Sequence, residues 1–167
     1  MKIVVKFGGS SLASAEQFKK VADIIHADPH RRFVVPSAPG KRFDGDTKVT
    51  DMLYACYDLA EADKDFDDAL ADIKARYDEI IEGLGLDLTL DKEFETIHEQ
   101  FRLKAGRNYA ASRGEYLNGI VLANYLGFEF VDAATVIRFD DAGNFEADRT
   151  DLILSSRLKD VEYAVVP

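Results

Sequence analysis

Residues 2–11 read KIVVKFGGSS, and this stretch decides the class of fold. Its β-branched residues, followed by two glycines and two serines, are typical of a strand that ends in a tight turn. Ser14 and Gln17 then have the spacing of a capping box, and apolar side chains recur at helical intervals. The sequence therefore predicts a strand over residues 2–7 and an amphipathic helix over residues 15–27.

A second short apolar run, residues 32–36, follows that helix and reads RFVVP. Strand, helix and strand at this spacing form a βαβ unit, in which the two strands pair in parallel and the connection is right-handed. Near the end of the chain, residues 128–132 and 162–167 also predict strands. The expected fold class is therefore α/β, a three-layer sandwich with a mostly parallel central sheet.

The middle of the chain has little strand signal and predicts a helical insertion over residues 50–107. Apolar residues recur there in three helical runs, which we expect to pack on one another and on the sheet. A fourth helix should end at Gly127, which has the position of a C-terminal cap. Residues 136–147 are interpreted as a hairpin and residues 151–158 as a short helix. Because the chain stops on a core-type strand, we expect the gene to continue.

Composition limits the classes of function. The chain has 167 residues, which favours one domain, and its formal net charge of −10 argues against nucleic acid as a partner. No apolar run is long enough for a membrane span, and Cys56 is the only cysteine, which suits a reducing cytoplasm. His26 and His30 are four residues apart, but a proline between them breaks the helix, so no metal site is expected.

Lys6 and the glycines that follow it are the strongest candidates for chemistry. Glycines let the backbone approach a ligand closely, and successive backbone N–H groups before a helix form an anion-binding turn. Lys6 would add a full positive charge beside a phosphoryl group in transfer. The lysine precedes the glycines, so the motif is neither a Walker loop nor a dinucleotide fingerprint. The same residues could also form only a tight turn.

Four segments together resemble a known family. Residues 4–11, VVKFGGSS, resemble the K-F-G-G-[ST]-S start of aspartate kinases, which form part of the amino acid kinase superfamily. Residues 34–40, VVPSAPG, are similar to the family's V-V-x-S-A-x-G loop, and residues 50–53, TDML, to its T-[ND]-x-L helix start. Residues 112–115, SRGE, are similar to its S-x-G-E motif. The resemblance covers essentially the whole chain.

The resemblance implies roles for the glycine-rich turn in binding ATP. Lys6 would be catalytic and stabilise the transferring phosphoryl group, while Gly8, Gly9 and Ser10 would lie beside the ATP phosphates. Mg²⁺ would bridge those phosphates.

The resemblance also implies that Ser37, Thr50 and Glu115 bind L-aspartate. A helix N-terminus at Thr50 suits a carboxylate, and the carboxylate of Glu115 suits the ammonium group of the substrate. Other interpretations remain open at this point. Glu115 could be an exposed helix carboxylate, Thr50 only an N-cap, and Ser37 a plain turn residue.

The sequence departs from the family in what it lacks. The later glycine-rich segment, the ATP-binding half and the ACT regulatory domains, which sense lysine or threonine, are all absent from residues 1–167. The implied activity is ATP-dependent phosphorylation of L-aspartate to 4-phospho-L-aspartate, by an enzyme that is homo-oligomeric at full length. The isolated chain is expected to be inactive. Two alternatives stay open: a kinase of the same superfamily acting on acetylglutamate, glutamate or carbamate, and a non-catalytic binding module.

Overall fold

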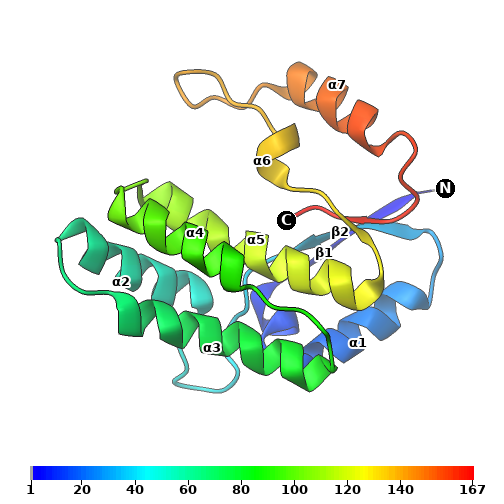
Figure 1. The fold of residues 1–167 in the computed structure, drawn as a ribbon. Helices are drawn as coiled ribbons and strands as arrows, with labels where there is room; N and C mark the ends of the chain where they lie inside the picture. Colours follow the sequence, from blue (N-terminus) through cyan, green and yellow to red (C-terminus); the bar gives the residue numbers. More distant parts are fainter. Residues whose placement is uncertain (1) are drawn as a thin grey trace.

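A central parallel sheet organises the computed structural model, which describes residues 2–167 (Figure 1). In these residues the sheet has four strands, in the order β1 (Ile3–Phe7), β2 (Arg31–Pro36), β4 (Ala164–Val165) and β3 (Glu129–Phe130). Every neighbouring pair is parallel. The expected α/β class with a mostly parallel sheet is confirmed.

The first βαβ unit is also confirmed. Strands β1 and β2 pair from Ile3 opposite Arg31 to Phe7 opposite Pro36. Helix α1 (Ala15–His26) connects them, and its N-cap side chain, Ser14, accepts a hydrogen bond from the backbone of the third following residue. A short 3₁₀ helix, η1 (Gly9–Leu12), occupies the turn that was expected after the first strand.

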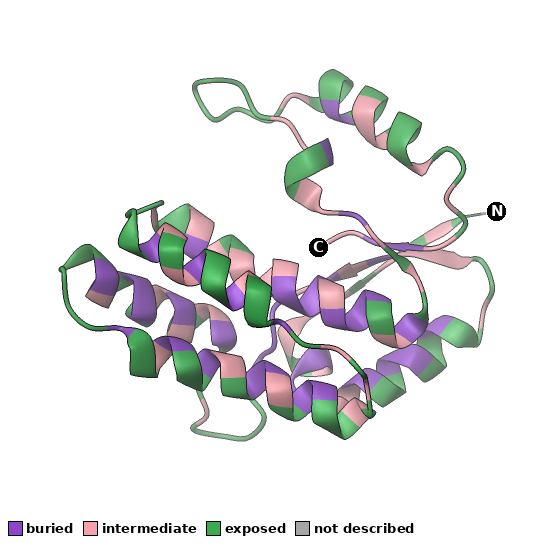
Figure 2. Cartoon of the chain, in the orientation of Figure 1, coloured by how far each residue is buried: buried purple, intermediate pink, exposed green. Residues whose placement is uncertain are grey.

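Four helices fill the middle of the chain, as predicted. They are α2 (Val49–Glu61), α3 (Asp67–Leu84), α4 (Asp91–Arg102) and α5 (Arg107–Leu126). Together with α1 they lie on one side of the sheet, and their inward faces are buried (Figure 2). Helix α5 lies directly on β2, β3 and β4, so the residues on its sheet-facing side are held close to the sheet.

Two smaller helices cover the other side of the sheet. Helices α6 (Ala133–Val136) and α7 (Ala147–Leu158) build a second apolar cluster there with Ala164. Side chains alternate along the strands, so Val34 belongs to the main core while its neighbour Phe33 packs on the second cluster. Helices, sheet and helices therefore form the three predicted layers (Figure 1).

The predicted hairpin over residues 136–147 is present in a reduced form, around the turn at residues 140–143. The Asp140 amide donates a hydrogen bond of 2.9 Å to the Asn144 carbonyl, and the Glu146 amide donates one of 3.0 Å to the Arg138 carbonyl. The two ends of the predicted range are helical instead: Val136 ends α6, which Asp132 caps by accepting a hydrogen bond of 3.0 Å from the Ala134 amide, and Ala147 begins α7. Only one antiparallel bridge, between Phe139 and Phe145, joins this segment within residues 2–167. Packing on the second cluster thus favours helix at Val136 despite its β-branched side chain.

Strand β1 forms one edge of the described sheet. Its Val5 and Phe7 pack on the main core, whereas Val4 is 65% exposed on the opposite face. Lys6 belongs to the same alternating set as Val4 and is also exposed. Along residues 2–167, no helix has both the length and the apolarity that a membrane crossing requires.

Candidate active site

The loops that follow β1 and β2 are in direct contact, because parallel neighbouring strands end at the same edge of a sheet. The Ser37 amide donates a hydrogen bond of 3.0 Å to the Phe7 carbonyl, and the Gly40 amide donates one of 2.8 Å to the Gly9 carbonyl. A Cβ on Gly9 would lie 2.8 Å from the carbonyl oxygen of Ala38. Only glycine fits this contact, so packing of the two loops alone requires a glycine at position 9.

An open cavity of about 430 Å³ lies beside this contact. It is built from the turn after β1, the loop after β2, the start of α2 and one side chain of α5. Five of the seven site residues expected from the sequence line it. The complete lining is Gly9, Ser10, Ser37, Ala38, Pro39, Gly40, Lys41, Lys48, Thr50 and Glu115.

Lys6 and Gly8 do not line this cavity. Lys6 is the penultimate residue of β1 and projects from the exposed face of this edge strand. Gly8 has an ordinary extended backbone, with φ −78° and ψ 168°, and a Cβ there would meet no atom within 4 Å. The structure thus brings the expected aspartate-binding residues together and leaves Lys6 at the rim of the sheet.

Glu115 is aimed at the loop after β2. Its Oε1 accepts a long hydrogen bond of 3.4 Å from the Ala38 amide. The preceding residue, Gly114, allows α5 to approach, because a Cβ there would lie 2.7 Å from the Ala38 Cβ. Glu115 is partly buried and lines a cavity, so it is not the plain exposed helix carboxylate that remained an alternative.

Two buried polar side chains hold this segment in place. The hydroxyl of Tyr77 donates a hydrogen bond of 2.8 Å to the Gly114 carbonyl. Burial raises the pKa of Tyr77 well above its usual value, and the negative charge of Glu115 raises it further, so the hydroxyl stays a neutral donor. Asn118 Nδ2 donates a hydrogen bond of 2.7 Å to the Ser37 carbonyl.

Thr50 lies in the first turn of α2 and is not its N-cap. The helix begins at Val49, and Lys48 occupies the N-cap position without a side-chain capping bond. The Val49 amide donates to the Pro39 carbonyl at 3.1 Å, which ties the helix start to the loop after β2. The interpretation of Thr50 as only an N-cap is therefore wrong, and Thr50 lines a cavity beside a positive helix end.

Two lysines at the cavity were not singled out by sequence reasoning. Lys41 and Lys48 flank the loop before α2, and within residues 2–167 neither forms an ion pair at 4.0 Å or less. The signal that could have found them is their position between the two motifs expected to bind substrate, in a chain that is acidic as a whole. They make the cavity locally cationic, which suits an anionic ligand.

A second cavity, of about 550 Å³, lies on the other side of Glu115. Glu115 lines both cavities. In the second one, the guanidinium of Arg113 lies 4.6 Å from the ring centre of Tyr109 and 4.5 Å from that of Tyr116. The SRGE segment therefore separates two cavities rather than lining a single one.

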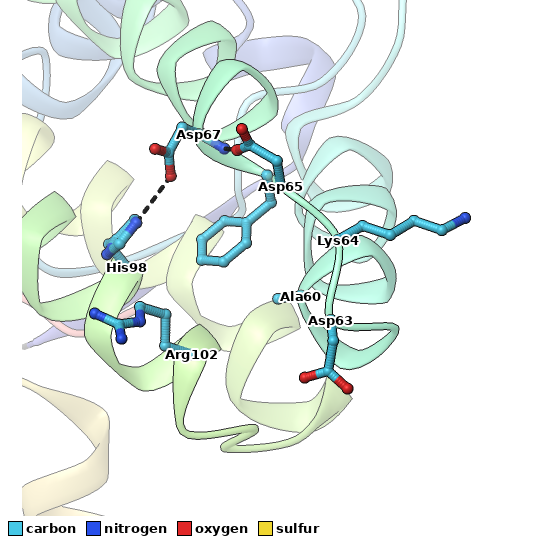
Figure 3. Close-up of a pocket in the computed structure, with 8 residues that line it drawn as sticks. Ala60, Asp63, Lys64, Asp65, Asp67, His98 and Arg102 are labelled. Atoms are coloured by element: carbon cyan, nitrogen blue, oxygen red, sulfur yellow. Dashed lines mark hydrogen bonds and ion pairs between the residues drawn. The ribbon is translucent and has the colours of Figure 1, made fainter.

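A third pocket lies among α2, α3 and α4, and no expected site residue lines it (Figure 3). His98 Nε2 and Asp67 Oδ1 are 2.9 Å apart there, and the ring of Phe66 lies 4.9 Å from that of His98. The lining is polar and open to solvent, so it is consistent with ordinary surface pairing of a histidine with a carboxylate.

The model of the amino acid kinase family matches residues 1–162. The chain belongs to this family. It is 30% identical to aspartokinase 2, chloroplastic, of Arabidopsis thaliana over 134 residues, which are 74% of the chain and 24% of that protein. It is 64% identical to aspartokinase 3 of Bacillus subtilis (strain 168) over 53 residues, which are 32% of the chain and 12% of that protein.

Solved structures agree with this family assignment. The crystal structure of Clostridium acetobutylicum aspartate kinase matches the whole chain with a TM-score of 0.95 and 45% identity. Escherichia coli aspartokinase III, in complex with aspartate and ADP, matches 99% of the chain with a TM-score of 0.75 and 21% identity, which supports the fold alone. This amino acid kinase chain spans 39% and 40% of those two chains, and a quarter or less of the curated relatives.

Proposed function

We propose that this chain is the substrate-binding part of an aspartate kinase, which phosphorylates the β-carboxylate of L-aspartate to give 4-phospho-L-aspartate. One observation carries the proposal. Ser37, Thr50 and Glu115 come from three distant segments of sequence and line one cavity. The 45% identity to an aspartate kinase over the whole chain supports the same substrate.

Each of the three residues offers a group that complements aspartate. Glu115 would bind the ammonium group by a charge-assisted hydrogen bond. Thr50, in the first turn of α2, would bind a carboxylate through its hydroxyl and the nearby backbone amides. Ser37 would orient the substrate. Its loop is held by Asn118, whose side chain donates a hydrogen bond to the Ser37 carbonyl. A dicarboxylic amino acid uses all of these groups, whereas a simple monocarboxylic acid does not.

ATP would approach the cavity from the turn after β1. Gly9 and Ser10 line the cavity, and Gly8 and Lys6 lie next to them in the chain. We assign Lys6 to offsetting the charge of the transferring phosphoryl group. We assign Gly8, Gly9 and Ser10 to binding the ATP phosphates. The exposure of Lys6 leaves its ammonium group free to reach a ligand bound over the sheet edge.

Mg²⁺ would accompany the nucleotide. Among residues 2–167, no three carboxylate, histidine or cysteine side chains gather in a cluster that could hold a metal ion. The ion would therefore be held by phosphate oxygens, which are the hard ligands that it prefers, and would neutralise their charge.

The chemical step needs little beyond positioning. The β-carboxylate is already ionised at neutral pH, so it attacks the γ-phosphorus without a general base. A carboxylate O–P bond forms, the bond between the γ-phosphorus and the β,γ-bridging oxygen breaks, and ADP leaves with that electron pair. The task of the chain is to hold the carboxylate in line and to offset negative charge in the transition state.

Because the chain spans only part of its relatives, several properties of the whole enzyme are proposals too. We propose that residues 1–167 alone are inactive, and that the full-length enzyme is a cytoplasmic homo-oligomer. Its place would be the first step of lysine, threonine and methionine biosynthesis, with allosteric feedback by one of those products.

A substrate panel tests the proposed function. The full open reading frame that carries this chain is incubated with Mg²⁺ and ATP, and acyl phosphate is trapped with hydroxylamine as a coloured hydroxamate. We expect product with L-aspartate and none with glutamate, acetylglutamate or carbamate. Product with one of those three would replace the substrate, and no product with any of the four would favour a binding module.

A further inference from the structure

Arg76 of α3 is a buried cation that the mechanism above does not use. Only 5% of its surface is exposed. Its Nη1 donates a hydrogen bond of 3.1 Å to the Thr47 carbonyl, and its Nη2 donates one of 3.0 Å to the Gly40 carbonyl. One guanidinium thus joins the two ends of the loop over residues 41–46.

Gly40 lines the candidate site, and Thr47 is next in sequence to Lys48, which also lines it. Gly40 is the residue whose amide bonds to Gly9, so it connects the loops after β1 and β2. Thr47 immediately precedes Lys48, the N-cap of the helix whose first turn carries Thr50. Arg76 therefore holds the loop after β2 and the helix start expected to bind a carboxylate at a fixed separation.

Among the described residues, the arginines near this loop are paired with carboxylates, whereas its lysines are not. Asp46 accepts from Arg42 Nε at 2.9 Å and lies 3.3 Å from Arg76 Nη1. Arg42 also pairs with Glu79 at 2.8 Å. These contacts use the two arginines and leave Lys41 and Lys48, at the ends of the loop, to face the cavity.

The way Arg76 is buried does not fit a role in stability alone. Burial disfavours its charged form and lowers the pKa of the guanidinium, and its Nε has no hydrogen-bond partner among the described residues. A buried charge whose groups are incompletely satisfied contributes little net stability compared with an apolar side chain of similar volume. The rigid fork of donors is instead suited to fixing two carbonyl groups relative to each other.

We propose that Arg76 is a positioning residue for the aspartate cavity: by bridging the carbonyls of Gly40 and Thr47 it sets the loop so that Lys41 and Lys48 form a cationic wall for the dicarboxylate. The ligand in this inference rests on the proposed function. The bridge itself rests on the geometry of Arg76.

The test compares Arg76→Met with Arg102→Met. Arg76→Met keeps the approximate length of the side chain but loses its hydrogen-bond donors. Arg102→Met removes an exposed arginine of α4 that lines neither of the two cavities beside Glu115. In the full open reading frame, Arg76→Met should raise KM for aspartate about tenfold or more, since bonds to charged groups are the stronger class. KM for ATP should change much less. Free guanidinium at a non-denaturing concentration should partly restore aspartate affinity to Arg76→Ala.

A second pair of variants keeps the inference testable if the Arg76 variants do not fold. Lys41→Met and Lys48→Met change exposed residues, and each should raise KM for aspartate severalfold, whereas Lys64→Met of the distant pocket should not. Unchanged KM for aspartate in folded Arg76→Met, or in both lysine variants, would overturn the proposal.

Hydrogen exchange separates this inference from the proposed function, because it requires no substrate. In Arg76→Met, amide exchange over residues 41–48 should become faster while that of β1 and α1 stays unchanged. Unchanged exchange over residues 41–48 would show that Arg76 does not hold the loop. Faster exchange over residues 41–48 in Arg76→Met, together with no phosphorylation of aspartate by the unmodified protein, would support the bridge and reject only the proposed substrate.

Discussion

The backbones of Gly9 and Gly40 are in contact. The Gly40 amide donates to the Gly9 carbonyl at 2.8 Å, and a Cβ on Gly40 would lie 2.6 Å from the carbonyl carbon of Gly9. This contact joins the turn that we assign to ATP to the loop that we assign to aspartate. The two loops of the proposed site are therefore packed together at this contact, and a substitution at either glycine should disturb both loops.

Substitution of Gly40 should be destabilising. In Gly40→Ala the added methyl group overlaps backbone rather than a flexible side chain, so we expect a loss of about 1–3 kcal/mol in the free energy of unfolding. Urea denaturation measures this difference. Gly8→Ala is the matched control, because a Cβ there meets no atom within 4 Å and the backbone is extended. Equal stability of the two variants would contradict the contact.

The hydrogen bond from Tyr77 to Gly114 should support the position of Glu115. Tyr77→Phe removes this hydroxyl. The Gly114 carbonyl lies inside α5 and keeps its place in the helical ladder, so the loss should be about 0.5–1.5 kcal/mol of stability. Thermal unfolding followed by circular dichroism measures the loss. Tyr54→Phe, at a half-exposed position of α2, should have almost no effect. If both variants melt alike, the buried hydrogen bond contributes nothing.

Cys56 should be unreactive in the folded protein. Burial raises the pKa of its thiol from 9.0 to about 12, and the nearby charge of Asp67 adds to this effect. Because the folded pKa is the higher one, the unfolded state loses its proton first, and stability falls as pH rises above 9.0 toward 12. Ellman's reagent at pH 8 should react slowly with native protein and at once in denaturant. Rapid reaction of the native protein would contradict the burial of this thiol.

Glu115→Gln should weaken aspartate binding without unfolding the chain. The amide keeps the size of the side chain but removes the negative charge that complements an ammonium group, so KM for aspartate should rise about tenfold or more. Steady-state kinetics on the full open reading frame measure this, with exposed Glu99→Gln of α4 as the control. An unchanged KM for aspartate would remove Glu115 from the substrate site.

Local patterns allowed the first βαβ unit and the helices of the middle region to be predicted. The capping spacing at Ser14 and the glycine at Gly127 report interactions within a few residues, and both are present. The hairpin over residues 136–147 is reduced to one bridge, because Val136 and Ala147 at its ends belong to the flanking helices. A four-residue helix such as α6 leaves almost no periodic signal in the sequence.

The supports of the candidate site could not be predicted in the same way. Arg76 reaches carbonyls that are 29 and 36 residues away in sequence, and Asn118 reaches one that is 81 residues away. Contacts of this kind depend on how α3 and α5 pack, which no local pattern encodes. The sequence indicated which residues could meet a ligand, but not the residues that hold them in place.

We propose that Lys6 offsets the charge of a phosphoryl group in transfer to aspartate. The most direct measurement is the rate of Mg²⁺–ATP-dependent phosphorylation of L-aspartate by the full open reading frame, with and without Lys6→Ala. Lys2→Ala, an exposed lysine beside the same strand, is the control. We predict that Lys6→Ala lowers kcat by about 10²-fold or more while Lys2→Ala leaves it unchanged. Aspartate phosphorylation that survives Lys6→Ala at the rate of the unmodified protein would contradict this assignment.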